Sequence, residues 1–317
     1  MRLTVIMAVH NAMPFLPEAI DSLRSQTYRG FQLLVVNDGS TDGSLSYLKS
    51  LTDERVSVIT VAARGGQGAA RNLALAQCDT EYTAFMDADD VSLPDRFARQ
   101  VQFFDENPAI GVLGTQIAYI GESGRTGFSP PLALTHDQIR MDLLRRRHAL
   151  AFGSIMYRTD ILKKSGGFRI AGSGEDWDLF LRVTELTRAA NLDETFYLYR
   201  VHKGCATTKQ AGHIALRYAH ACECARLRCA GGAETHFDDF CERQRRRSLW
   251  QRWVEQLDGH ASACYREALE HILNDNPLKG YFRLLLAAAL SPGRLVQRAQ
   301  RAIRAARPIA RISGVVD

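Results

Sequence analysis

The chain has 317 residues, 46% of them hydrophobic and 24% charged, a composition typical of a globular protein with a packed core. The longest clean apolar run, at residues 284–290, is too short to span a bilayer. No cleavage-site pattern follows the apolar N-terminus, so we expect neither a transmembrane helix nor a signal peptide. The net charge is +5, but residues 279–317 alone hold eight basic residues and one acid. Residues 279–317 thus have a net charge of +7 and residues 1–278 a net charge of −2. The mildly acidic first part argues against nucleic acid as the main substrate.

The first half of the chain alternates short apolar segments with helical patterns. We expect strands at residues 3–9, 31–37, 56–61 and 82–86, and helices at about 16–26, 44–51 and 69–77, with a further helix opening at Pro94. This alternation predicts parallel βαβ units in an open α/β sheet, whose ligands bind beyond the carboxyl ends of the strands. Residues 37–39, 65–68 and 87–90 should therefore share one edge of the sheet.

The second half is less regular. It predicts strands at about 110–119, 153–157 and 195–202, and helices at about 135–146 and 175–186. After Gly204 the pattern is almost wholly helical. We therefore expect a first domain at 1–205, with halves at 1–109 and 110–205, and a helical extension at 206–317.

Three carboxylates, Asp87, Asp89 and Asp90, follow the fourth strand within four positions. They repel one another, and a hard divalent cation such as Mg²⁺ or Mn²⁺ would remove that repulsion. A lone D-x-D pattern is weak support for a metal site. Asp90 with the residues up to Pro94 could instead cap the next helix.

Two further motifs fall on the same predicted edge. Asp38, in the sequence Asp-Gly-Ser, could accept hydrogen bonds from a nucleobase or ribose, or could belong to a plain turn. Glycines at 65, 66 and 68 precede a helix that carries Arg71, which could reach a phosphate or lie on the surface beside a flexible loop. The spacing matches neither the dinucleotide fingerprint nor a Walker loop.

The cysteines form no recognisable metal pattern. The chain has seven, and four of them crowd one helical region near several histidines: Cys222, Cys224, Cys229 and Cys241. Their C-x-C-x4-C spacing fits no common zinc site, so we interpret them as reduced structural or incidental thiols.

Five motifs occur in a characteristic order. They are VIMAVHNAMPFLPEAIDSLRSQTYRGFQLLVVNDGSTDGS, GGQGAARNLAL, EYTAFMDADDVSLPDRF, GGFRIAGSGEDWDLFLRV and FYLYRVH. Over about residues 3–203 the chain resembles the inverting nucleotide-sugar glycosyltransferases of family 2, which have the GT-A fold. The resemblance implies an α/β fold with an open, mostly parallel twisted sheet flanked by helices, here followed by an all-helical extension.

The resemblance also implies roles for individual residues. The donor-binding set would be Ala8, His10, Asn11, Asp38, Gly39, Arg71, Asp87 and Ala88. Asp89 would be the principal metal ligand, assisted by Asp87 and His202. The acidic pair Glu175-Asp176 would supply the catalytic base, which we assign to Asp176; without the resemblance, the pair could equally cap a helix. The chain departs from the family where Ala8-Val9-His10-Asn11 lacks the usual Pro and aromatic residue, which leaves the nucleotide preference open.

The expected reaction is the transfer of a sugar, with inversion, from a nucleotide diphosphate sugar such as a UDP-sugar to an acceptor hydroxyl. Mn²⁺ or Mg²⁺ is the expected cofactor. A glycan or lipid-linked glycan of bacterial surface polysaccharide or lipopolysaccharide is the expected acceptor, by analogy. A sugar-nucleotide pyrophosphorylase and a catalytically silent membrane-surface binding protein remain as alternatives.

The C-terminal segment has the pattern of a basic amphipathic helix. Ser291-Pro292 is a helix start, after which four arginines share one side and small apolar residues the other: Arg294, Arg298, Arg301 and Arg304. This pattern predicts docking on an anionic membrane surface, at the cytoplasmic inner face of the cell membrane. The alternative is a helix packed on the body with its arginines solvated.

Overall fold

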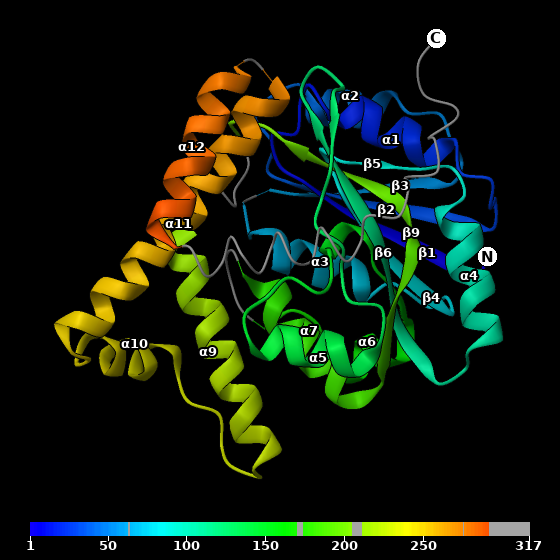
Figure 1. The fold of residues 1–317 in the computed structure, drawn as a ribbon. Helices are drawn as coiled ribbons and strands as arrows, with labels where there is room; N and C mark the ends of the chain where they lie inside the picture. Colours follow the sequence, from blue (N-terminus) through cyan, green and yellow to red (C-terminus); the bar gives the residue numbers. More distant parts are fainter. Residues whose placement is uncertain (63, 170–173, 205–210, 275, 292–317) are drawn as a thin grey trace.

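The computed structural model describes residues 1–62, 64–169, 174–204, 211–274 and 276–291, and gives only the backbone of residues 211–212, 249, 251–256 and 258 (Figure 1). The strands are β1 (Leu3–Val9), β2 (Phe31–Asp38), β3 (Val56–Val61), β4 (Tyr82–Asp87), β5 (Val91–Ser92), β6 (Ile110–Gly121), β7 (Thr126–Gly127), β8 (Met156–Arg158) and β9 (Arg188–Val201). The helices are α1 (Leu16–Arg24), α2 (Ser44–Ser50), α3 (Gln67–Leu75), α4 (Arg96–Glu106), α5 (His136–Leu144), η1 (Phe152–Ser154), α6 (Thr159–Lys164), α7 (Glu175–Leu186), α9 (Ala211–Cys229), α10 (Phe237–Arg245), α11 (Leu249–Asn274) and α12 (Pro277–Leu290).

The nine strands of the described residues belong to one sheet, in the order β3-β2-β1-β4-β8-β6-β9-β5, with β7 paired to β6. Strands β1 to β4 run parallel to one another, and β6 pairs with β9 in parallel as well. The short strand β8 is antiparallel to both of its neighbours, β4 and β6. The predicted open, mostly parallel α/β sheet with flanking helices is therefore confirmed.

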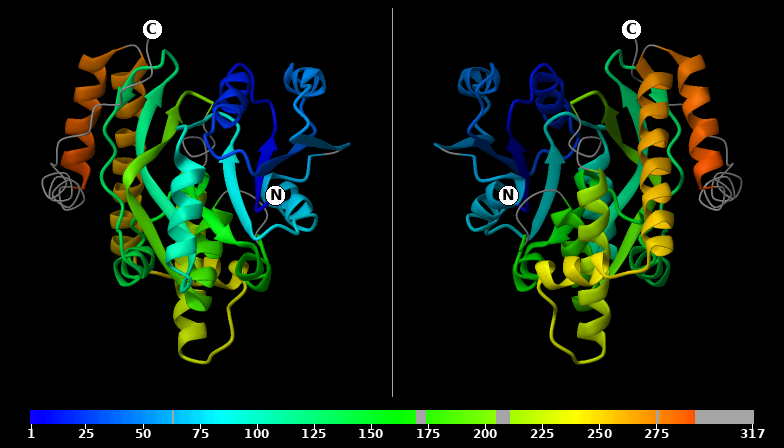
Figure 2. Two further views of the ribbon diagram at one scale, coloured as in Figure 1. Left: turned by 90° about the vertical axis from the view of Figure 1, so that its right-hand side faces the viewer. Right: turned by 90° about the vertical axis from the view of Figure 1, so that its left-hand side faces the viewer.

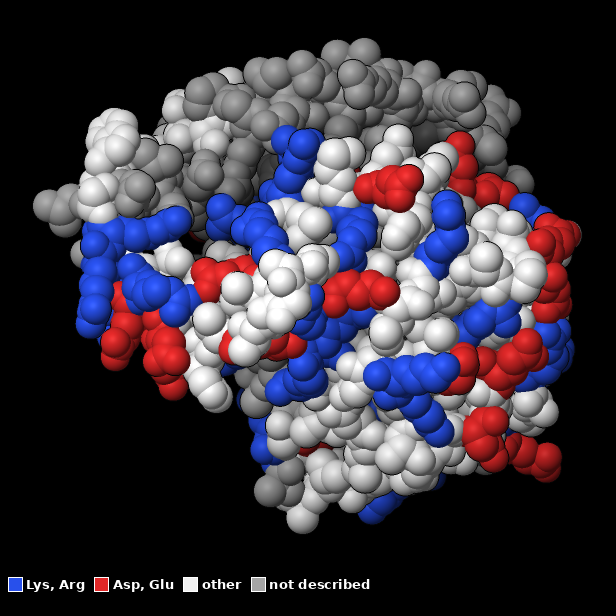
Figure 3. All heavy atoms as spheres, turned by 90° about the horizontal axis from the view of Figure 1, so that it is seen from below, with Lys and Arg blue, Asp and Glu red and all other residues white. Residues whose placement is uncertain are grey.

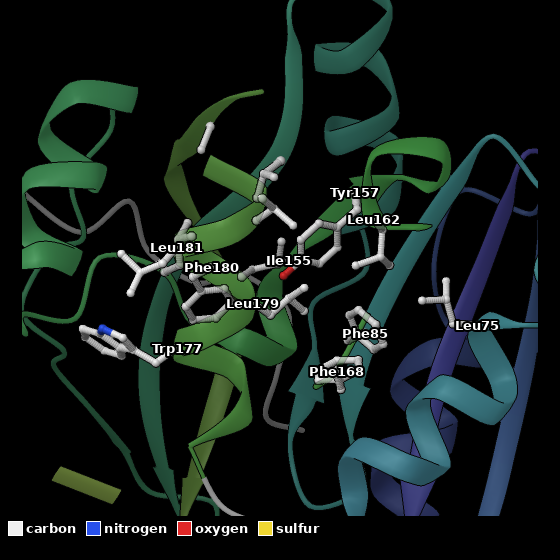
Figure 4. Close-up of a cluster of buried hydrophobic side chains, with 14 of the residues drawn as sticks. Leu75, Phe85, Ile155, Tyr157, Leu162, Phe168, Trp177, Leu179, Phe180 and Leu181 are labelled. Carbon is white, nitrogen blue, oxygen red and sulfur yellow. The ribbon is translucent and has the colours of Figure 1, made fainter. Parts of the chain in front are cut away.

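Alternate residues of the parallel strands pack into two hydrophobic cores, one on each face of the sheet. Val5 and Met7 belong to the core beneath α1 and α4, whereas Ile6 between them belongs to the core beneath α3, α5 and α7. This is the period-two alternation of a strand covered on both faces. Figure 4 shows the second core, where the rings of Phe85 and Phe168 meet edge to face at 5.5 Å.

The C-terminal helices confirm the predicted helical extension for the described residues. Helix α9 adds Ala221, Cys222 and Ala225 to the core shared with α7, so its inner face packs directly on the first part of the chain. Arg228 of α9 also bonds to Glu185 of α7 at 2.7 Å. The expected boundary at 205/206 falls at residues outside the described part, and the division into domains stays a prediction.

Two expected strands differ from the observed ones. Strand β9 begins at Arg188 rather than at 195, because it continues alongside β6 through a register shift. The strand expected at 153–157 is instead the short helix η1 followed by β8. Among the described helices, none is both long enough and apolar enough to cross a membrane.

The lower face of the molecule carries side chains of both charges. Lys and Arg are interspersed there with Asp and Glu (Figure 3), as in an ordinary solvated surface. The C-terminal arginines that dominate the sequence pattern lie at 294–311, outside the described residues.

Candidate active site

The carboxyl ends of β1, β2 and β4 meet at one edge of the sheet. Ala8 of β1 is in register with Val36 of β2 on one side and with Asp87 of β4 on the other. This parallel register brings Asp38, the last residue of β2, to the same edge as Asp87, the last residue of β4. We call this edge the rim. Residues 37–39 and 87–90, which the sequence predicts to share one edge of the sheet, therefore do so.

Asp38 holds the glycine-rich loop in place. Its Oδ1 accepts a hydrogen bond from the amide of Gly65 at 2.7 Å, and its Oδ2 accepts one from Gly66 at 2.9 Å. Gly66 has a φ of 88°, a conformation that favours glycine. Each carboxylate oxygen retains lone-pair capacity for a ligand, so the predicted contact with a nucleobase or ribose stays a prediction.

The loops after β1 and β2 are bonded to each other. The ring Nδ1 of His10 lies 2.8 Å from the carbonyl oxygen of Asp38. Asn11, whose φ is 51°, accepts through Oδ1 from the amide of Thr41 at 2.7 Å. Gly39 also has a positive φ, 67°, which lets the chain turn between these contacts. These hydrogen bonds hold the predicted donor-binding residues His10, Asn11 and Gly39 close together. Their contacts with a donor stay a prediction.

Arg71 joins the two parts of the site. From the buried face of α3 its Nη2 donates to Asp87 Oδ1 and its Nη1 donates to Glu175 Oε1, both at 2.9 Å. Its guanidinium lies 4.0 Å from the centre of the Phe152 ring. The sequence places Arg71 near the nucleotide; the structure shows it bonded to two carboxylates, one from β4 and one from α7. Arg71 thus links the ends of two elements that are far apart in the chain.

Asp87 and Asp90 have perturbed acidities. Burial raises the pKa of Asp87 to about 6, with Asp89 and Glu175 adding to the rise and Arg71 opposing it. Burial, together with the negative charges of Asp89 and Asp87, raises the pKa of Asp90 well above its usual range. Asp90 accepts from the amide of Arg200 at 2.7 Å, so it ties the loop after β4 to β9.

Asp89 and His202 are brought together. Asp89 Oδ2 lies 3.0 Å from His202 Nε2, and 34% of the Asp89 side chain is exposed. Arg200 fixes the backbone here by donating from Nε to the Asp89 carbonyl at 2.7 Å. In the described part of the chain, no three His, Cys, Asp or Glu side chains gather as a metal site. Asp87, the third predicted ligand, is bonded to Arg71 instead.

The Asp89–His202 pair nevertheless suits a hard divalent cation. Mg²⁺ needs few protein ligands, because it keeps several waters and takes the remaining ligands from substrate phosphates. Coordination through His202 Nε2 would leave the ring proton on Nδ1. The amide of Gly204, which donates to Nδ1 at 3.2 Å, would then have to turn away.

The two acids that open α7 differ in environment. Glu175 is 4% exposed and is paired with Arg71, so it is committed to the interior. Asp176 is partly exposed and accepts from the amide of Trp177 at 2.9 Å. Burial, reinforced by Glu175, raises the pKa of Asp176 to about 7. A carboxylate with this pKa can take up a proton near neutral pH.

Helix α9 contributes side chains that the sequence does not reveal. The Tyr218 ring stacks on Trp177, with centroids 4.1 Å apart, and His148 meets both rings edge-on. A Cβ at Gly174, the residue before α7, would lie 3.5 Å from the Tyr218 ring. Tyr218 therefore supports the turn that carries the acidic pair. No local motif marks it, because its partner lies 41 residues earlier in the chain.

Comparison with known proteins agrees with this geometry. Residues 4–166 match Glycosyl transferase family 2. The O-antigen biosynthesis glycosyltransferase WbnJ of Escherichia coli is 32% identical over 206 residues, which cover 63% of this chain and 80% of WbnJ. The putative glycosyltransferase EpsE of Bacillus subtilis is 29% identical over 206 residues, covering 63% of this chain and 73% of EpsE.

Solved structures share the fold at lower identity. S. aureus TarS 1-349 in complex with UDP-GlcNAc superposes with a TM-score of 0.57 at 19% identity, covering 95% of this chain and 92% of that fragment. The mannosyltransferase PcManGT of Pyrobaculum calidifontis, in complex with GDP-Man and Mn²⁺, has a TM-score of 0.52 at 17% identity. The match covers 97% of this chain and 81% of the PcManGT chain. The sequence match spans half of the chain and the fold agrees along nearly all of it: the protein belongs to glycosyltransferase family 2.

Proposed function

We propose that this glycosyltransferase moves a sugar from a nucleotide diphosphate sugar to an acceptor hydroxyl with inversion, and that Asp176 is the general base. The chain of contacts from Asp87 through Arg71 to Glu175 carries the proposal. Glu175 precedes Asp176 at the start of α7, so these contacts support a position for the base close to Asp87. Asp176 combines partial exposure with a pKa of about 7, whereas Glu175 is buried in an ion pair.

The proposed reaction is a single displacement. The acceptor oxygen bonds to the anomeric carbon while the bond from that carbon to the diphosphate breaks, and Asp176 takes the hydroxyl proton. Asp38, Arg71 and Asp87 would position the donor, with His10, Asn11 and the backbone of Ala8, Gly39 and Ala88 around it. A bound Mn²⁺ or Mg²⁺, held by Asp89 and His202, would supply neutralisation of the charge on the leaving diphosphate.

For the donor we propose a UDP-sugar, and for the acceptor a glycan or lipid-linked glycan of a bacterial surface polysaccharide. Support comes from relatives only: TarS was solved with UDP-GlcNAc and WbnJ is described by O-antigen biosynthesis. PcManGT was solved with GDP-Man, so a GDP-sugar is the competing donor. We further propose a peripheral location on the cytoplasmic membrane face. The tail expected to provide it lies outside the described residues.

The proposal is tested by measuring nucleoside diphosphate release from UDP- and GDP-sugars, with Mn²⁺ and with chelator, for the wild type, Asp89→Asn and His202→Gln. We expect metal-dependent release in the wild type. Asp89→Asn should lose it, and His202→Gln should need about tenfold more Mn²⁺. Full activity in chelator would contradict the metal role. Release of pyrophosphate from a nucleoside triphosphate and a sugar 1-phosphate would instead identify a pyrophosphorylase.

A further inference from the structure

Helix α12 presents a row of large apolar side chains to solvent. Leu278 is 83% exposed, Phe282 67% and Leu285 71%. Tyr281, at 57%, and Leu286, at 36%, complete the row. The spacing of three, four, seven and eight residues puts all five on one side of the helix, which we call the α12 outer face. A contiguous apolar face of this kind marks an interaction surface.

The orientation of this face is fixed by packing on the opposite side of the helix. Gly280 and Ala287 are buried against α11. A Cβ at Gly280 would lie 2.5 Å from Ile272 Cγ1 and 2.9 Å from the carbonyl oxygen of Ala268. Figure 2 shows α12 on the far side of α11 from the sheet. The small residues therefore allow close approach to α11 and direct the large ones outward.

The start of α12 lies beside the end of β9, the strand that leads to His202. Asn274, the last residue of α11, donates from Nδ2 to the carbonyl oxygen of Val201 at 3.0 Å and accepts from the amide of Glu122 at 2.6 Å. Val201 is the last residue of β9 and immediately precedes His202. The N-terminal end of α12 therefore lies on the side of the molecule where β9 ends, one residue before His202.

The charge of the neighbouring chain indicates what covers the face. The residues that follow α12 include six arginines and a single acid, Asp317: Arg294, Arg298, Arg301, Arg304, Arg307 and Arg311. Lys279 is exposed on α12 itself. The occupant must accept both apolar side chains and dense positive charge, as an anionic lipid surface does. A second copy of the chain would bring two such basic segments together, and they would repel each other.

We propose that the α12 outer face inserts into the headgroup region of an anionic bilayer, with Leu278, Tyr281, Phe282, Leu285 and Leu286 in contact with lipid. Burial of the apolar side chains among the lipids favours insertion, and the basic residues that follow α12 bind the lipid phosphates. The rim is then held at the membrane surface. This last consequence rests on the proposed function, because it matters only to an enzyme whose acceptor is carried in the membrane.

The test is co-sedimentation of the full chain with vesicles of neutral lipid and of neutral lipid mixed with phosphatidylglycerol. The variant is Phe282→Ser with Leu285→Ser. The matched control is Met141→Ser with Leu186→Ser, two apolar residues that are 44% and 51% exposed on other helices. We expect the variant to bind the anionic vesicles about tenfold more weakly and the control to bind as the wild type does. Equal binding of wild type and variant would overturn the proposal.

Two further measurements identify other occupants. If the wild type self-associates without lipid and the variant does not, the face is an interface between copies. The variant Leu285→Trp adds one tryptophan to the α12 outer face. Quenching of the fluorescence of that tryptophan by brominated lipid supports insertion. Protection of that residue from a soluble quencher before lipid is added would show that the chain covers its own face, and would also overturn the proposal. Donor hydrolysis without vesicles is measured in parallel, so that a failure of the proposed enzyme activity is distinguished from a failure of docking.

Discussion

The rim of the sheet and the α12 outer face depart from an ordinary protein surface in opposite ways. At the rim, charged groups are buried and held: Asp38 accepts from two backbone amides, and Arg71 bridges two carboxylates. On α12, large apolar groups are exposed, and small residues on the inner side fix their direction. Buried charge of this kind indicates a site where chemistry needs fixed geometry. Exposed apolar area indicates a surface that binds another body.

The largest expected effect is at the rim, where Asp176→Asn should lower transfer roughly a thousandfold, because the amide cannot accept the proton. Donor affinity should change little, since the proposed donor contacts lie elsewhere. Turnover and calorimetric donor binding measure the two quantities. Asp160→Asn, an exposed acid at the start of α6, is the control. If donor binding falls as much as turnover, Asp176 belongs to the donor site and is not the base.

Arg71→Met should be the most destabilising change, costing about 3 kcal/mol of unfolding free energy, because it leaves Asp87 and Glu175 without their shared cation. Arg99→Met removes the matched exposed pair with Glu194, whose side chains are 44% and 47% exposed, and should cost under about 1 kcal/mol. Chemical denaturation measures both variants. Similar costs would mean that burial of the Arg71 pairs adds nothing to stability.

Tyr218→Ala should cost about 2 kcal/mol and also lower turnover, since the ring that stacks on Trp177 is lost. Tyr218→Phe keeps the ring and should preserve both properties. The comparison of the two variants separates support by the ring from a role of the hydroxyl. A loss of turnover in Tyr218→Phe with unchanged stability would assign the effect to the hydroxyl.

A smaller effect concerns the pH dependence of stability. Burial raises the pKa of Asp176 from the ordinary 3.8 to about 7, so between these values the folded protein keeps a proton that the unfolded chain releases. Wild-type stability should therefore fall through this window relative to Asp176→Asn, which has no such proton. We expect the variant and the wild type to be equally stable near pH 4, and the variant to become progressively more stable than the wild type as the pH rises to about 7. Chemical denaturation across this pH range measures the difference in unfolding free energy between the two proteins. A difference that does not change with pH would show that Asp176 keeps no such proton.

The smallest effect is expected on α12. Phe282→Ser with Leu285→Ser should change the unfolding free energy by less than about 0.5 kcal/mol, because both side chains already face water. A large loss of stability would show that these side chains are buried in solution. The same denaturation series then tests whether the apolar surface serves binding rather than folding.

The parallel arrangement of strands β1 to β4 and the position of the rim follow from the sequence, because parallel βαβ units obey general rules and their apolar runs are clear. Asp38 and Asp87 could be singled out for the same reason, since each ends a strand. Asp176 is expected only from the resemblance to the family. The start of β9 could not be predicted: its first residues, RAANLDE, have no strand pattern and are strands only because β6 lies beside them.

The contacts within the site were also beyond sequence reasoning. Arg71 and Glu175 are 104 positions apart, and no local spacing shows that they meet. Tyr218 comes from the helical extension, where no motif was found. The outward face of α12 was missed because an apolar stripe in a sequence is normally buried, and only the packing of Gly280 shows which side faces α11.

The bridge made by Arg71 has a thermodynamic consequence. Asp87, Glu175 and the guanidinium all act on the pKa of Asp176, so a ligand that adds negative charge beside Asp87 must strengthen proton binding at Asp176. By reciprocity, the proton on Asp176 strengthens the binding of that ligand by the same factor. For the proposed donor, whose diphosphate is negative until a cation neutralises it, binding without the cation should therefore weaken as the pH rises through about 7. The cation that the proposed reaction uses would remove this linkage, so that a bound donor and an ionised base can coexist.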